Sequence, residues 1–137
     1  MSINQFIEHY FFIIFIIFWI ANSLLISVMS GWWQLARDYK IVFPFQGRKW
    51  HCQSITLRAS VRYGSMMTVG GNSLGIYLCC FFPFRLGHPP LFIPWSEISW
   101  KRERKMWQKV VKLRIAKHPT IPIWITERLF NKIVALK

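Results

Sequence analysis

One apolar stretch, residues Phe11–Met29, constrains this chain more than any other feature. It contains no charged residue, and its polar side chains are Asn22, Ser23 and Ser27. An α-helix rises about 1.5 Å per residue, so about 20 apolar residues cross a hydrocarbon core of about 30 Å. Residues 11–30 are therefore predicted to form a transmembrane helix that follows a short N-terminal segment, 1–10.

The charges that flank this stretch predict its orientation. Glu8 precedes it, whereas Arg37, Lys40, Arg48 and Lys49 follow it. Cytoplasmic flanks of membrane helices carry an excess of Lys and Arg, so we expect a single-pass protein of the cell (inner) membrane, N-terminus outside and domain in the cytoplasm. A cleaved signal peptide is the alternative, although it normally has a basic leading segment and a shorter apolar run of about 7–15 residues.

The rest of the chain is strongly basic. All 18 Lys and Arg residues follow the apolar stretch, together with four of the five acidic residues. The part of the chain after the stretch therefore has a formal charge of +14. Such a domain attracts polyanions, either anionic lipid headgroups or nucleic acid. No recognised nucleic-acid motif accompanies the charge, so nucleic acid is the less expected partner.

The polar residues give little support for catalysis or for a cofactor. The four His residues show no metal-ligand spacing, and three Cys do not complete a zinc set. The acidic residues of the domain are scattered along the sequence, at Asp38, Glu97, Glu103 and Glu127. We therefore expect no enzymatic activity and no cofactor, and we expect Cys52, Cys79 and Cys80 to be reduced thiols.

Residues 31–47 are predicted to form an interfacial helix and a linker. Spacing of i, i+3 and i+4 collects on one helical face Trp32, Leu35, Ala36 and Tyr39. The transmembrane helix is expected to continue into this segment, with Trp32, Trp33 and Tyr39 anchored among the lipid headgroups. Pro44 then ends the helical pattern.

Residues 48–137 are predicted to form one domain of antiparallel strands. Ile55–Arg62 alternates apolar and polar side chains as a half-buried strand does, and Tyr63-Gly64 is expected to turn the chain. Gly70–Asn72 predicts a tight hairpin. Further strands are expected at Met66–Val69, Ile76–Phe82, Leu91–Ile93, Val111–Ile115 and Ile121–Ile125.

The chain ends in a predicted amphipathic helix. Thr126 can cap this helix, and Glu127 favours the positive end of its dipole. An apolar stripe is formed by Leu129, Phe130, Ile133 and Val134. The predicted fold class is therefore α+β: an N-terminal transmembrane helix, then a small antiparallel β-barrel with a C-terminal amphipathic helix.

Two segments carry a family resemblance. Leu74–Ile98 reads LGIYLCCFFPFRLGHPPLFIPWSEI and resembles the pattern of GRAM and bacterial pleckstrin-homology (PH)-like domains. Together, Gly31–Tyr39 and Arg85–Ile98 are similar to uncharacterised bacterial single-pass membrane proteins with a PH/GRAM-like domain. The resemblance implies a bent barrel closed at one end by its final helix, used as a non-enzymatic binding module.

A basic cluster bracketed by tryptophans is the first candidate site. It is predicted as a loop that contacts anionic lipid through Lys101, Arg102, Arg104, Lys105, Trp100 and Trp107. The alternative is a solvated loop between two strands. A second candidate is a ligand or partner loop with Arg85, His88 and Trp95; in the structural alternative, Trp95 fills the core and Arg85 pairs with Glu97.

The polar residues of the apolar stretch suggest a partner in the membrane. Asn22 and Ser23 can hydrogen-bond to another helix, in a membrane protein partner or a homo-oligomer. The alternative is that these side chains bond to their own helix backbone. A membrane partner would make the protein an accessory subunit of a larger membrane complex, which is the second function considered besides lipid binding.

Overall fold

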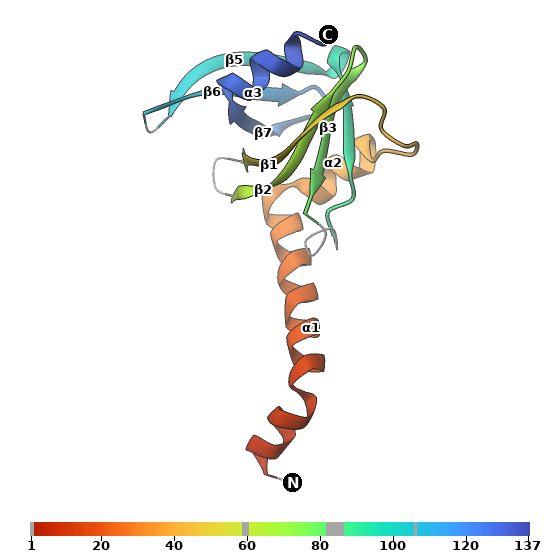
Figure 1. The fold of residues 1–137 in the computed structure, drawn as a ribbon, viewed down its shortest axis with the longest axis vertical. Coiled ribbons are helices and arrows are strands. Elements are labelled where there is room, and N and C mark those ends of the chain that lie inside the picture. The colour runs from red at the N-terminus through yellow and green to blue at the C-terminus, as the bar shows by residue number, and fades with distance from the viewer. Residues whose placement is uncertain (1, 59–60, 82–86, 106) are drawn as a thin grey trace.

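The computed structural model describes residues 2–58, 61–81, 87–105 and 107–137. A long helix, α1, projects from a small domain built of one curled antiparallel sheet and two short helices (Figure 1). The elements run in the order α1 (Ile3–Ser30), α2 (Trp32–Tyr39), β1 (Arg48–Leu57), β2 (Val61–Gly71), β3 (Gly75–Cys80), β4 (Leu91–Pro94), the 3-10 turn η2 (Trp95–Glu97), β5 (Ile98–Lys105), β6 (Gln108–Ile115), β7 (His118–Thr126) and α3 (Glu127–Val134).

Helix α1 confirms the predicted helical segment and begins earlier, at Ile3. Its first turn is closed by a capping box, in which Ser2 and Gln5 each bond to the other's backbone. Its 28 residues have a mean hydropathy of 2.5 over the most apolar part, and large apolar side chains are exposed along it. By length and composition α1 is able to cross a membrane.

The sheet has seven strands in the described part of the chain, ordered β4-β3-β2-β1-β7-β6-β5 and antiparallel throughout. Strands β1 to β4 pair in sequence, as do β5 to β7, and β7 lies beside β1, so β4 and β5 are the two edges of the sheet. The β1–β7 junction is short, with Thr56 opposite Trp124 and Leu57 opposite Ile123. The sheet therefore curls into a half-barrel, and α3 lies against it at the end remote from α1 (Figure 1).

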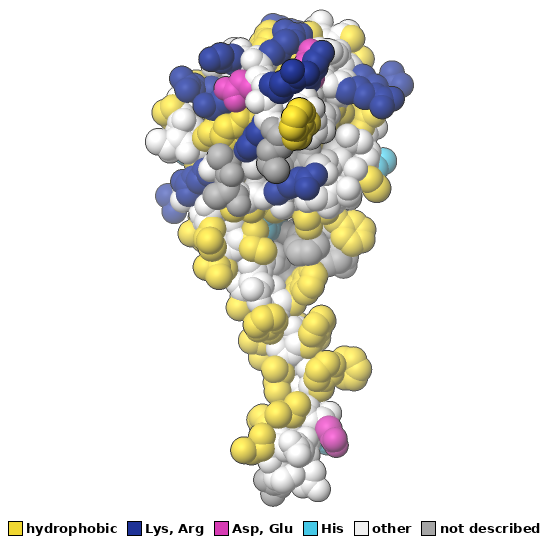
Figure 2. Space-filling model, turned by 90° about the vertical axis from the view of Figure 1, so that its left-hand side faces the viewer, with side chains coloured by type: hydrophobic (Ala, Val, Ile, Leu, Met, Phe, Trp, Pro, Cys, Tyr) yellow, Lys and Arg dark blue, Asp and Glu magenta, His cyan; other side chains and the backbone are white. Residues whose placement is uncertain are grey.

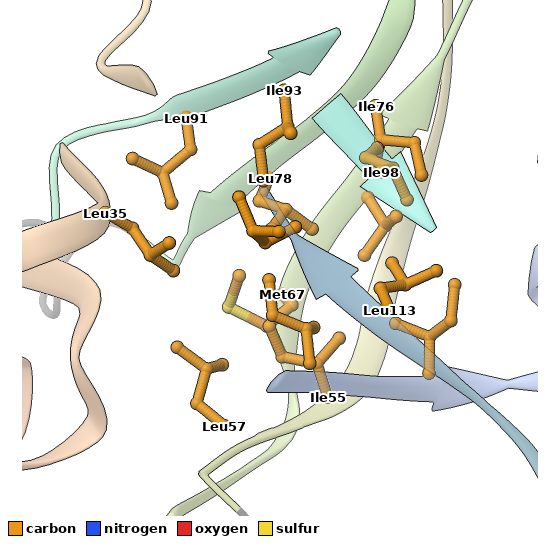
Figure 3. Packing of buried hydrophobic residues seen from close by; sticks show 14 of the residues in the cluster. Leu35, Ile55, Leu57, Met67, Ile76, Leu78, Leu91, Ile93, Ile98 and Leu113 are labelled. Carbon is orange, nitrogen blue, oxygen red and sulfur yellow. The ribbon is translucent and has the colours of Figure 1, made fainter. Parts of the chain in front are cut away.

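The core lies between the concave face of the sheet, α2 and α3. Alternate residues of the strands point inward, as their apolar–polar pattern predicts. Figure 3 shows Leu35 pointing from α2 into the cluster that contains Leu57, Met67 and Leu91. All four side chains are completely buried. Helix α2 is therefore part of the domain core.

The prediction of a single strand over Ile55–Arg62 is wrong. The chain reverses between β1 and β2, where Leu57 pairs with Val61, and Tyr63 lies inside β2 opposite Ile55. Inward positions in β1 and β2 are separated by an even number of residues, so the alternation stays in phase across the turn. The sequence period therefore gave no sign of the reversal.

The expectation that the basic cluster forms a loop is also wrong. After η2 the chain enters β5, which pairs with β6 from Ile98 to Lys105. A run of five charged residues is typical of a solvent-exposed loop. Here the run lies on β5, an edge strand that pairs with β6 on one side and is unpaired on the other. Charged side chains are common on such edges because they prevent pairing with other chains.

Helix α1 does not continue into α2. Gly31 adopts a left-handed conformation (φ 88°) between the two helices. Trp32 and Tyr39 are 0% and 5% exposed, because the apolar face of α2 packs on the sheet, whereas Trp33 is 44% exposed. The prediction that Trp32 and Tyr39 are anchored among lipid headgroups is therefore wrong. An apolar helical stripe does not distinguish a lipid interface from a protein core.

Other sequence predictions are confirmed. The chain turns after Gly71, and all residues of β3 are buried, with Tyr77 covered on the outer side by the stacked ring of Phe45 at 4.5 Å. Of the strand predicted at Ile76–Phe82, Phe81 follows the end of β3 and is exposed, and Phe82 lies outside the described residues. Helix α3 begins where predicted, since the Thr126 hydroxyl accepts from the Leu129 backbone N–H at 3.3 Å.

Replacing Gly31 by Ala is expected to destabilise the domain by about 1–3 kcal/mol, because φ is positive and a Cβ atom would lie 2.7 Å from Ile121 Cδ1. Gly64→Ala is the matched control, since a Cβ there meets nothing within 4 Å. Thermal unfolding of the full chain in detergent measures both. Equal midpoints for the two variants would show that the α1–α2 break tolerates a side chain.

Candidate functional site

The predicted basic cluster divides between the two faces of β5. Trp100 and Arg102 face α3: the Trp100 ring lies 5.4 Å from the Phe130 ring, and Arg102 Nε lies 3.5 Å from Glu127 Oε1. Residues alternate along a strand, so Lys101 and Lys105 belong to the opposite face. Trp107, 98% exposed, follows β5 in the β5–β6 connection. The six residues predicted as one lipid-contact patch do not form one.

The outer face of the sheet, opposite the core, is centred on Trp124. Its indole N–H donates to Glu103 Oε2 at 3.2 Å. The Nζ atoms of Lys105 and Lys112 lie 4.7 and 5.4 Å from the ring centroid. These cation–π contacts hold two ammonium groups above one side chain, so the surface concentrates positive charge around an aromatic ring.

Strand register extends this arrangement across five strands. Each residue is the cross-strand neighbour of the next in the series Lys101, Lys112, Trp124, Thr56 and Arg62. Cross-strand neighbours on one face have Cβ atoms about 4.5–5.5 Å apart. We call this series the basic row; it brings together residues from β1, β2, β5, β6 and β7.

A cleft opens beside the row, where β1 and β7 diverge beyond the Thr56–Trp124 pair. Register shifts in β1 between Trp50 and Ile55, and a positive φ of 56° at Cys52, bend β1 away from β7. The resulting hollow has a volume of about 530 Å³. Its lining residues are Cys52, Gln53, Ser54, Thr56, Arg62, Lys105, Gln108, Val110, Trp124, Ile125 and Thr126.

A second hollow of about 280 Å³ shares Gln53 and Thr126 with the first. It is lined by Trp50, Gln53, Thr126, Arg128, Leu129 and Lys132. We call the two hollows together the β1–β7 cleft. In the described part of the chain, four cations and no carboxylate line it. Figure 2 shows Lys and Arg spread over the domain, while hydrophobic side chains cover the helix below.

The second predicted site is only partly within the described residues. His88 is completely buried, with Nε2 2.9 Å from the Tyr63 hydroxyl, so it is not exposed to a ligand. Trp95 is 8% exposed and its indole donates to the Asn72 carbonyl at 2.9 Å, as the structural alternative expected. Arg85, and with it the expected pair with Glu97, lies outside the described residues.

Buried hydrogen bonds join α1 to the domain. The Tyr63 hydroxyl donates to Ser30 Oγ at 2.8 Å, Trp32 Nε1 donates to the Pro89 carbonyl at 2.8 Å, and Ser27 Oγ donates to the Gly87 carbonyl. Burial raises the pKa of Tyr63 above its ordinary value, so this phenol stays neutral. The last turns of α1 thus turn their serines toward the chain's own domain.

Asn22 and Ser23, the residues predicted to bond to a partner helix, have different surroundings in the structure. The Asn22 amide donates to the Phe18 carbonyl at 2.9 Å, which is the local backbone bond of the alternative reading. Ser23 is 2% exposed within the chain itself. Neither arrangement requires a second membrane helix.

Tyr39 gives the domain a predicted pH dependence. Burial and the hydrogen bond to Glu97 raise the pKa of Tyr39 from 10.0 to about 12. The folded state therefore holds this proton more tightly, and the resulting stability, complete below pH 10, is lost as pH rises to about 12. Tyr39→Phe cannot ionise, so its unfolding midpoint should fall less steeply over this range. Parallel curves would contradict the assignment.

Sequence reasoning missed the residues that the register brings together, chiefly Arg62, Lys112 and Trp124. A signal existed, because each occupies an outward position in an alternating strand. Which outward positions are neighbours depends on strand order, which the alternation does not contain. Within the described residues, no three His, Cys, Asp or Glu side chains gather closely enough to hold a metal ion.

Comparison of this chain with protein-family models, with curated proteins and with solved structures finds no match.

Proposed function

We propose that this protein is a single-pass membrane protein whose domain is a non-enzymatic module that binds an anionic partner at the membrane surface. The observation that carries the proposal is the basic row with the adjoining cleft. There, Lys105 and Lys112 lie over the Trp124 ring, Arg62 follows Thr56 in the row, and Glu103 is the acidic neighbour. Cations on a surface beside an aromatic ring suit carboxylate or phosphate groups.

A PH/GRAM-like identity for the domain is part of the proposal. Seven antiparallel strands curl into a half-barrel, and the C-terminal helix packs at its end. This order supports the resemblance carried by Gly31–Tyr39 and Arg85–Ile98. PH-like folds serve varied partners, so the partner has to be argued from the surface rather than from the fold.

The proposed location is the inner membrane, with the N-terminus outside and the domain in the cytoplasm. The exposed apolar side chains of α1 support the span, and the +14 charge after it supports the orientation. Arg58 Nη1 lies 3.3 Å from the Met29 carbonyl, so Arg58 lies at the end of α1. Cations near Arg58 lie closest to anionic headgroups.

The alternative partner is another protein, with this chain as an accessory subunit of a membrane complex. The observation that favours it is the direction of the basic row, which extends from β2 to the edge strand β5. Strand β5 lies away from α1 in Figure 1, so this end of the row is far from the headgroups around α1. Nucleic acid stays the least favoured partner.

The proposal predicts that Lys101→Glu with Lys112→Glu weakens anion binding at least tenfold, because the pair forms one end of the row. The measurement is the affinity of the full chain, in nanodiscs of neutral lipid, for fluorescent polyglutamate at several salt concentrations. Arg104→Glu with Lys109→Glu is the matched control: it is also a cross-strand pair of β5 and β6, with the same charge change.

Binding by the wild type that is lost in the first variant and kept in the control supports the proposed surface. Equal weakening in both variants would mean that net charge alone attracts the polymer. Binding that does not depend on salt would also contradict an anion-binding surface.

A further inference from the structure

We infer that the β1–β7 cleft binds an extended acidic segment of a partner protein. This inference rests on the proposed function and names the class of its partner. It starts from the divergence of β1 and β7, which leaves a cleft long enough for several residues of chain. From Leu57 to Trp50, at about 3.3 Å per residue, β1 extends for roughly 23 Å.

The walls of the cleft are complementary to carboxylates. Arg62 and Lys105 line the first hollow, and Arg128 and Lys132 line the second hollow, next to α3. Among the described residues, neither lining set contains Asp or Glu; Glu103, which accepts from the Trp124 indole, lies outside both sets. Cations spaced along a cleft, without acidic residues between them, match an acidic segment better than one isolated anion.

The rest of the lining matches a polypeptide. Hydroxyl and amide side chains that can bond to a main chain are supplied by Gln53, Ser54, Thr56, Gln108 and Thr126. Within the described residues, the β1–β7 ladder stops at Thr56, so the edge of β1 that precedes it faces the cleft. An unpaired strand edge offers backbone donors and acceptors to an extended peptide.

An aromatic side chain belongs to each half of the cleft. Trp124 lines the first hollow, and Trp50, with Arg48 at 5.5 Å from its ring, lines the second. Apolar side chains of a bound segment can pack on these rings while its carboxylates meet the cations. The preferred segment therefore alternates acidic and apolar residues.

The direction of the cleft favours a peptide over a lipid headgroup. Its near end is lined by Thr56, two residues before Arg58, and Arg58 donates to the Met29 carbonyl near the end of α1. Its far end is formed by α3, which lies at the end of the domain remote from α1 (Figure 1). Headgroups of the bilayer that holds α1 therefore reach the near end alone.

The surroundings of Trp124 disfavour single-stranded nucleic acid. Such ligands bind through bases stacked on open aromatic faces. Here Lys105 and Lys112 already lie over the ring, and the indole N–H is bonded to Glu103. A stacked base would have to displace these lysines, whereas the carboxylates of a peptide can pair with them where they lie.

The test measures fluorescence anisotropy of a labelled ten-residue peptide of alternating Glu and Val, titrated with the full chain in neutral-lipid nanodiscs. Arg62→Glu with Arg128→Glu changes one exposed cation in each hollow and should weaken binding at least tenfold. The control, Arg104→Glu with Lys109→Glu, has the same charge change outside the cleft and should weaken binding less than threefold. Equal weakening in the two variants, or no binding by the wild type, overturns the inference.

Two further probes separate this inference from the proposed function. Vesicles containing phosphatidylglycerol and a labelled ten-nucleotide thymidine strand are titrated with the same proteins. If the peptide fails to bind but either probe binds and loses affinity in the cleft variant, the peptide inference is overturned and an anion-binding module remains. If none of the three probes binds, both the peptide inference and the proposed anion-binding function are overturned.

Discussion

Replacing Ile13 and Ile17 by Arg is expected to prevent stable integration of the protein into membranes. Both side chains are more than half exposed on α1 and lie one helical turn apart. An arginine near the centre of a membrane helix opposes insertion by about 2.5–3.5 kcal/mol on the insertion scale, so two oppose it by roughly 5–7 kcal/mol. The wild type should stay in the membrane pellet after alkaline extraction, and the variant should leave it.

Ile13→Leu with Ile17→Leu is the control, because it keeps the apolar surface and should stay in the pellet. The intact mass of the membrane-bound protein completes the test. A mass that includes residues 1–30 agrees with an anchor, whereas loss of this segment would indicate a cleaved signal peptide. Retention of the arginine variant in the pellet would show that α1 is not what holds the protein.

Replacing Trp32 by Ala is expected to lower the free energy of unfolding by about 3–5 kcal/mol. The side chain is 0% exposed, packs against Tyr63 and His88, and donates a hydrogen bond to the Pro89 carbonyl. Its removal leaves a cavity at the junction of α1, α2 and the sheet. Chemical unfolding of the full chain in detergent, followed by circular dichroism, measures the change.

Trp33→Ala is the matched control for this prediction. Its side chain is 44% exposed, so the free energy of unfolding should change by no more than about 0.5 kcal/mol. The pair of variants separates the two roles proposed for this segment. If both tryptophans were headgroup anchors, the two variants would unfold alike and would differ from the wild type mainly in membrane binding.

Much of the fold follows from the sequence, because local patterns determine local elements. The uncharged run that includes Ile13 and Ile17 predicts α1, Gly70–Asn72 predicts a turn, and Thr126 predicts the start of α3. These predictions hold since each depends on backbone geometry or capping within a few residues. The resemblance also led to the correct coarse class, a helix followed by an antiparallel sheet and a final helix.

The errors arise where distant residues determine the outcome. Trp32 has the spacing of an interfacial helix, but its surroundings come from β2 and the segment before β4. The charges of Lys101–Lys105 look like a loop until β6 pairs with them. The basic row is invisible in the sequence, because Arg62 and Trp124 become neighbours of Thr56 only through two strand pairings.

The central claim, that the outer face of the sheet binds an anionic partner, is tested most directly at Cys52. This thiol is exposed and lines the cleft, whereas Cys79 and Cys80 are 3% and 1% exposed, so a maleimide should label Cys52 selectively in the folded protein. The measurement is the rate of Cys52 alkylation in the full chain, in neutral-lipid nanodiscs, with and without polyglutamate. If the outer face binds the polymer, labelling should slow several-fold, and added salt should restore the rate. An unchanged rate, at polymer concentrations that saturate binding, would contradict the central claim.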